Sequence, residues 1–209
     1  MTNSLLGSLL LMVGLLAADA AAQPHRVTQW PLRSWQGTAI LLAIGAFLAG
    51  VFLAIIGTWA LSMFIAFLLI SVLSLVSNVK RQVLGEPLVF TDFALIGAVF
   101  QHPHFYISAL KSWQIIAIIV GFATLGSLAA IFSTNDLTAR AIGFIIVVVA
   151  ALGLKAMITL PGWAKLVERP DVDRDVHAHG LIATLFVYWR FWSHLPDLTA
   201  RALPTITSD

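Results

Sequence analysis

Long apolar runs dominate the chain and predict helices that cross a membrane. No charged residue occurs in residues 34–79, and a single helix over these 46 residues would be roughly 69 Å long at about 1.5 Å per residue. That length is over twice the ~30 Å hydrocarbon core of a bilayer. The run must therefore contain two helices. Gly57 and Thr58 form the best break, which predicts spans at 38–56 and 59–77 joined by a tight turn.

Three further apolar stretches extend this pattern. Residues 113–132 and 141–160 each have the length that one span needs, and Lys155 near the end of the second can extend its side chain to the headgroups. Residues 5–22 predict a first span. Their Ala-rich end also resembles the cleavage region of a signal peptide, but no cation precedes it. The fold class is therefore all-α, with about five transmembrane helices, and a cleaved signal at 5–22 stays an alternative.

The C-terminal part has a different pattern. Residues 1–165 form the predicted polytopic membrane domain, whereas charges alternate after it and predict a linker at 166–209. Within this linker, residues 181–192 are apolar and aromatic apart from Arg190. Twelve residues cannot cross a bilayer. We expect an amphipathic helix that lies flat in the membrane interface.

Composition supports a membrane protein. Hydrophobic residues make up 59% of the chain, charged residues make up 11%, and the mean hydropathy is +0.93, whereas soluble domains carry about 25% charged residues. The 209 residues are enough for five spans but not for a soluble catalytic domain as well. The chain has no cysteine, which excludes disulfides and thiolate chemistry. The net charge of +2 comes from scattered cations and predicts no nucleic-acid partner.

The stretch 78–92, NVKRQVLGEPLVFTD, collects the polar residues that could carry chemistry. Lys80 and Arg81 stand at the end of a predicted span, where cations often anchor a helix among lipid phosphates. Glu86 and Asp92 would be costly at an apolar boundary unless they pair with cations or meet a polar ligand. The predicted lipid-headgroup site consists of Asn78, Lys80, Arg81, Glu86 and Asp92, and the predicted structural turn consists of Gly85 and Pro87.

The spacing of this stretch resembles a known signature. Lys80, the run LGEPL at 84–88 and Asp92, with a span on either side, are similar to the membrane-domain motif of the lipoteichoic acid synthase and phosphoglycerol transferase family. One position departs from the motif. An asparagine often stands three residues before the lysine, but here Ser77 has that place and Asn78 lies two before.

The resemblance implies a function. In that family a membrane domain holds a glycerophospholipid donor in the bacterial cytoplasmic membrane, and an extracytoplasmic sulfatase-like domain transfers the headgroup with a metal-bound threonine. No residue of this chain matches that catalytic motif, so the chain would be a truncated or split member. Neither a catalytic residue nor a cofactor is expected within it, and the divalent metal would belong to the missing domain. Membrane phospholipid and that domain are the implied partners.

Two arguments about sidedness conflict. The predicted loops after spans one and three and the tail carry nearly all cations, and the opposite side carries only Arg140. The positive-inside rule therefore predicts that the stretch 78–92 is cytoplasmic. The resemblance implies that the stretch and the C-terminal tail are extracytoplasmic. We favour the resemblance, because long tails translocate largely regardless of their charge.

Other functions have weaker signals. A non-enzymatic membrane scaffold is the first alternative. A small transporter is the second, although spans two to four lack the ionisable residues that transporters carry at mid-bilayer. The pairs His102/His104 and His177/His179 would make a metal site only if they converged. The acidic run at 171–175 lacks the glycine and glutamate of a calcium loop, and we expect a solvated linker there.

Overall fold

A computed structural model describes residues 2–22, 34–92, 136–159 and 171–190, with 123–124, 127, 131 and 133–134 between them. Its helices contain all the regular secondary structure of this part of the chain. The labelled helices are α1 (Thr2–Ala20), α2 (Trp35–Ile56), α3 (Trp59–Leu84), α7 (Leu137–Ile158), α9 (Val172–His179) and α10 (Leu181–Arg190).

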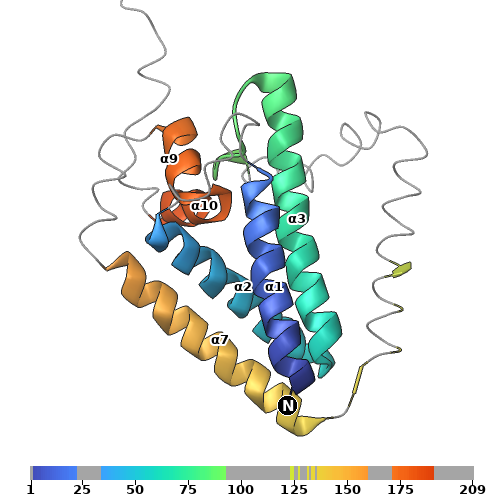
Figure 1. The fold of residues 1–209 in the computed structure, drawn as a ribbon. Helices are drawn as coiled ribbons and strands as arrows, with labels where there is room; N and C mark the ends of the chain where they lie inside the picture. The colour runs from blue at the N-terminus through green and yellow to red at the C-terminus, as the bar shows by residue number, and fades with distance from the viewer. Residues whose placement is uncertain are drawn as a thin grey trace, which may run out of the picture.

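The long helices run between two ends of a bundle (Figure 1). α1 and α3 lie side by side and run in the same direction, whereas α2 runs the opposite way and lies against α7. The short helices α9 and α10 cover the end at which α2 begins and α1, α3 and α7 finish. We call this the α10 end. The tight turn between α2 and α3 lies at the opposite end.

Local chemistry sets where these helices start and stop. The Ser34 hydroxyl accepts a hydrogen bond from Gly37 N–H and so caps α2. Gly57 ends α2 with φ of 79°, a left-handed conformation that glycine adopts without strain. Thr134 N–H donates to Ile56 O over 3.0 Å, and the carboxylate of Asp136 caps α7. The start of α7 is thereby fixed at the α2–α3 turn.

Small residues let α2 and α7 approach closely. A Cβ on Gly143 would lie 2.5 Å from Ala54 N, and one on Gly50 would lie 3.0 Å from Gly143 O. Neither site has room for a side chain. In a bilayer the hydrophobic effect does not draw helices together, so close packing through small residues is what holds them. The spacings Gly50/Ala54 and Ala139/Gly143 are the small-xxx-small pattern on both helices.

Three of the described helices are long and apolar enough to cross a membrane, Trp35–Ile56, Trp59–Gln82 and Leu137–Ile158, which makes this a membrane protein by helix length and composition. They correspond to the predicted spans 38–56, 59–77 and 141–160. The predicted first span at 5–22 corresponds to the helix α1, which is not one of these three helices. The predicted span at 113–132 lies almost entirely outside the described residues. The structure therefore supports three of the five predicted spans.

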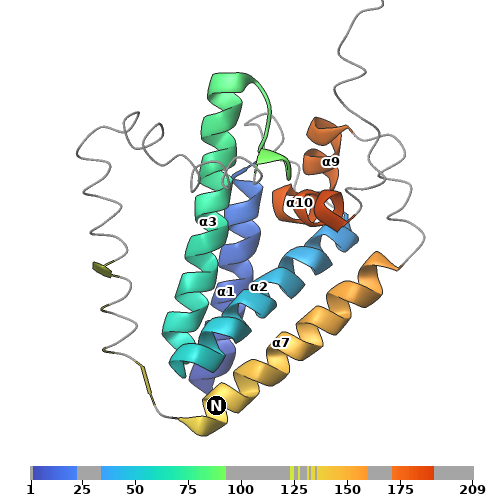
Figure 2. The same ribbon diagram turned by 180° about the vertical axis from the view of Figure 1, so that it is seen from behind.

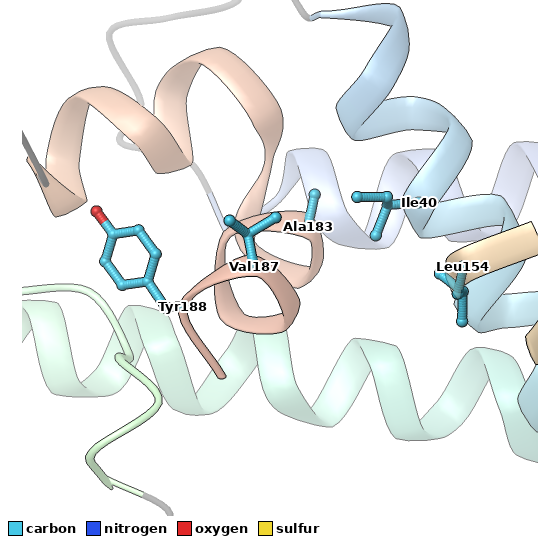
Figure 3. Close-up of a cluster of buried hydrophobic side chains, with 5 residues drawn as sticks. All are labelled: Ile40, Leu154, Ala183, Val187 and Tyr188. Carbon is cyan, nitrogen blue, oxygen red and sulfur yellow. The ribbon is translucent and has the colours of Figure 1, made fainter. Parts of the chain in front are cut away.

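The helix predicted at 181–192 is observed as α10, and it packs against the protein more than a surface helix would. Its flat placement in the membrane interface stays a prediction. Seven of its ten residues are buried, and Ala183, Val187 and Tyr188 pack with Ile40 of α2 and Leu154 of α7 (Figure 3). The helix has no polar face to keep in water, so the bundle end can enclose most of it. The Thr184 hydroxyl donates to the carbonyl of Gly180, the residue just before the helix. The short apolar helix is therefore covered by protein on most sides.

α9 also departs from the expectation, since the acidic run forms a helix and its cap instead of a solvated linker. Asp171 caps α9 by accepting from Arg174 N–H. Asp175 is buried and accepts a hydrogen bond from Tyr188, and Asp173 pairs with Arg81. Charge alternation along the sequence indicated solvent, but each carboxylate has a partner in the fold.

Candidate headgroup site at the α10 end

The 85–92 loop folds back onto the last turns of α3 (Figure 2). Gly85 N–H donates to Arg81 O, and its φ of 79° turns the chain out of the helix. Pro87 is fully buried. Leu88 N–H donates to the hydroxyl of Ser77 over 3.1 Å, which anchors the returning chain on the helix that it has just left.

Lys80 and Asp92, two of the predicted site residues, lie together at the base of this loop. Lys80 Nζ is 2.7 Å from Asp92 Oδ2 and donates to Pro87 O over 3.2 Å. The same carboxylate oxygen accepts from Val89 N–H over 2.8 Å. The two side chains are only 14% and 20% exposed, so the pair is largely screened from solvent. Their visible role is to hold the loop.

Arg81 points to a different part of the chain. Its Nη2 donates to Asp173 of α9 over 2.6 Å, and Asp173 is 58% exposed. Nη1 of the same guanidinium is buried and has no hydrogen-bond partner among the described residues, which is an unusual state for a charged donor. Arg81 is therefore a cation with one acidic partner at the surface and donor capacity left over.

Glu86 is the predicted site residue that the fold leaves open. It is exposed, and its carboxylate makes no hydrogen bond or ion pair with any residue that the structure describes. Asn78, by contrast, donates to Ala21 O over 2.7 Å and ties α3 to the end of α1. The structure thus separates the predicted residues into Asn78, Lys80 and Asp92, which hold the fold, and Arg81 and Glu86, which have polar atoms to spare.

Three polar contacts around α10 were not expected from the sequence. The buried carboxylate of Asp19 in α1 accepts from Ile182 N–H over 2.9 Å at the start of α10. Ser34 Oγ lies 2.6 Å from His179 Nδ1, so the first turn of α2 is bonded to the end of α9. Each joins residues far apart in the chain, and only Asp19 had a local signal, as the one charge in an apolar run. The third contact is the Tyr188 pair described next.

Tyr188 donates its hydroxyl to Asp175 Oδ2 over 2.7 Å. Desolvation by burial, together with the hydrogen bond and the charge of Asp175, raises the pKa of the phenol far above its ordinary value. A neutral phenol is therefore built into the contact between α9 and α10.

The raised pKa predicts sensitivity to alkali. Because the folded-state pKa lies above the unfolded value of about 10, Tyr188 stabilises the fold fully below that pH and loses this effect as the pH rises above it. We expect the free energy of unfolding to fall by up to about 1.4 kcal/mol per pH unit from this group. Denaturant unfolding in micelles from about pH 9 to 11.5 measures the slope. The decline should be shallower in Tyr188→Phe, and equal slopes in both proteins would contradict the assignment.

A metal has little to hold it in the described part of the chain. Among those residues, no three histidine, aspartate or glutamate side chains gather as ligands. His179 is engaged with Ser34, and His102 and His104 lie outside the described residues.

The cations gather at the α10 end. The described residues include six of them, and five lie on elements at that end, namely Lys80, Arg81, Lys155, Arg174 and Arg190. Arg140 is near the α2–α3 turn, where it donates to Thr134 O. Six of the seven described carboxylates lie at the same end, so the described charges there nearly cancel, namely Asp19, Glu86, Asp92, Asp171, Asp173 and Asp175. Comparison of the chain with protein-family models, curated proteins and solved structures found no match.

Proposed function

We propose that this chain is a lipid-holding membrane domain of the phosphoglycerol transferase kind, which binds the glycerophosphate headgroup of a membrane phospholipid at the 85–92 loop. Transfer of the headgroup would need a sulfatase-like catalytic domain that is not part of this sequence. The observation that carries the proposal is that some charged residues hold the loop and another is left exposed on it. Lys80 and Asp92 hold it in place, and Glu86 stands exposed on it.

A glycerophosphate headgroup suits what the site leaves available. Its phosphate carries a negative charge and would accept charge-assisted bonds from Arg81, whose fork of N–H donors matches phosphate geometry. Its glycerol hydroxyls are donors, and the Glu86 carboxylate is an acceptor. Arg81 on the last turn of α3 would thus contact the phosphate, and Glu86 on the loop would contact the glycerol.

Asp173 has a further role in this proposal. Its carboxylate pairs with Arg81 at the surface and so occupies the donors that a phosphate would use. Exposed ion pairs contribute only about 0.2–1 kcal/mol. An arriving phosphate would therefore displace Asp173 at little cost.

Lipid retention tests these roles. Wild type and variants would be purified in mild detergent and their bound lipid measured by native mass spectrometry, with phosphatidylglycerol, phosphatidic acid or phosphatidylcholine supplied. We expect Arg81→Gln to lower phosphatidylglycerol retention about tenfold or more, since hydrogen bonds to charged groups contribute about 1.5–3 kcal/mol. Asp173→Asn should raise it by removing the competing carboxylate. Glu86→Gln should reduce the preference for phosphatidylglycerol over phosphatidic acid, which lacks the glycerol hydroxyls.

The matched control is Lys155→Gln. It removes the same charge from the same end of the bundle, and Lys155 is exposed. It should retain lipid as the wild type does. Retention that is unchanged in Arg81→Gln, or lost equally in Lys155→Gln, would refute the headgroup site and favour the scaffold alternative.

A further inference from the structure

An apolar groove lies between α2, α3 and α10, with a volume of about 290 Å³. Its walls include Ile44 and Leu48 of α2, Ile70 and Leu73 of α3, and Phe186 and Trp189 of α10. We propose that this groove binds one hydrocarbon chain of the phospholipid whose headgroup the 85–92 loop holds. This inference rests on the function proposed above and assigns a second subsite to the same ligand.

The occupant is hydrocarbon because of where the groove opens. Two of its walls belong to α2 and α3, which are long and apolar enough to span the membrane. The groove therefore faces the acyl region of the bilayer, and every side chain that lines it is apolar. Water finds no polar partner there. Its volume is near the lower limit of the roughly 300–1,000 Å³ of ligand pockets, which suits one chain rather than a whole lipid.

The groove is continuous with the headgroup loop through Phe90. This side chain lines the groove. In sequence it lies between Val89 and Asp92, and the Asp92 carboxylate accepts a hydrogen bond from Val89 N–H. Trp189 marks the outer rim. It is 53% exposed and its ring centroid lies 5.8 Å from that of Phe186, a position that suits the membrane interface. The polar loop and the apolar groove are thus adjacent, as the headgroup and the acyl chain are in a lipid.

The loop also supplies the reason for specific binding. A chain gains no hydrophobic energy by leaving the bilayer for an apolar groove, because both surroundings are hydrocarbon. A headgroup held at the loop keeps its own chain beside the groove at high effective concentration. Occupancy should therefore depend on the headgroup.

A second apolar cavity provides an internal control. It has a volume of about 260 Å³ and lies among α1, α2, α3 and α7. Its lining includes Leu53 and Trp59, which flank the turn at the end opposite the loop. It should take bulk lipid without regard to the headgroup.

The test is photo-crosslinking in bilayer nanodiscs of phosphatidylcholine that contain the whole chain. The probe is phosphatidylglycerol with a diazirine midway along one acyl chain, and phosphatidylcholine with the same diazirine is the comparison. Crosslinked residues are mapped by mass spectrometry. We expect about tenfold more labelling in the groove than in the second cavity with the phosphatidylglycerol probe, equivalent to ~1.4 kcal/mol, and even labelling with the other probe.

Substitutions in the lining test whether the labelling comes from the groove. Leu48→Trp fills the groove from α2 and Leu73→Trp fills it from α3, so both should abolish the preference. Ala49→Leu, the neighbour that faces the second cavity, should keep it. The wild-type map needs no variant, so a misfolded tryptophan variant leaves the test intact.

The two proposals fail in different ways. Even labelling by the phosphatidylglycerol probe overturns the groove inference, and the headgroup proposal still stands if Arg81→Gln lowers lipid retention. Strong groove labelling that is the same for both probes and unchanged by Arg81→Gln supports a chain in the groove and refutes the headgroup site.

Discussion

Replacing Gly143 by valine is expected to force α2 and α7 apart and to lower the free energy of unfolding by about 3 kcal/mol or more. The added Cβ would lie 2.5 Å from Ala54 N and 2.9 Å from Gly50 O. Both are backbone atoms, which cannot rotate out of the way as a flexible side chain can. The helices would have to separate and lose the packing that holds them in a bilayer.

Gly153→Val is the matched control. Gly153 lies on the same helix, and a Cβ there would meet no neighbouring atom of the described part of the chain within 4 Å. Both substitutions carry the same change in helix propensity. The difference in stability between the two variants therefore reports the contact between α2 and α7 alone. Thermal unfolding in micelles, followed by circular dichroism, measures both. A similar loss of stability in the two variants would show that α2 and α7 are not packed as described.

Breaking the Lys80–Asp92 pair is expected to have the second largest effect. Lys80→Met or Asp92→Asn should destabilise the fold by about 2–3 kcal/mol, because each leaves a poorly solvated charge without its partner. The loop would also lose the bonds from Lys80 to Pro87 O and from Val89 N–H to the carboxylate. Arg81→Gln should cost less than ~1 kcal/mol, since its partner Asp173 is exposed.

A double-mutant cycle measures the interaction energy between Lys80 and Asp92 separately from their contacts with other residues. The double variant Lys80→Met/Asp92→Asn should recover part of the loss, because no uncompensated charge remains. Chemical unfolding of the four proteins in the same micelle gives the coupling energy. Additive effects of the two substitutions would mean that the ion pair does not form in solution.

The spans were predictable because they are local features. The uncharged run 34–79 had to contain two helices, and Gly57 could be recognised as the break from its neighbours alone. The helices at 35–56 and 59–84 agree, although α3 continues beyond the predicted 77, through the cations as far as Gly85. A helix can carry Lys80 and Arg81 on its last turns, so the first charge is a poor guide to its end.

The candidate site was predictable only in part. The sequence placed Lys80, Arg81, Glu86 and Asp92 in one stretch, but it could not say which charge faces which. The distinction depends on two contacts. The Ser77 hydroxyl of α3 accepts from Leu88 N–H, and Asp173, 92 residues after Arg81, accepts from its guanidinium. Contacts over such separations leave no trace in local periodicity.

The same limit applies to the burial of α10 within the protein. Its length correctly excluded a span, and the presence of Trp189 and Arg190 favoured the interface. What buries the helix is the shape of the bundle end, where three apolar clusters meet it from α1, α2, α7 and the 85–92 loop. That shape arises only when all these elements are in place.

The hydrogen bond between Asp19 and Ile182 can form only late in the synthesis of this chain. Ile182 is synthesised 163 residues after Asp19, which at about 5–20 residues per second takes roughly 8 to 33 s. Throughout that interval the Asp19 carboxylate of α1 lacks the amide that later meets it. α10 therefore completes the burial of Asp19 only after α2, α3 and α7 have been made.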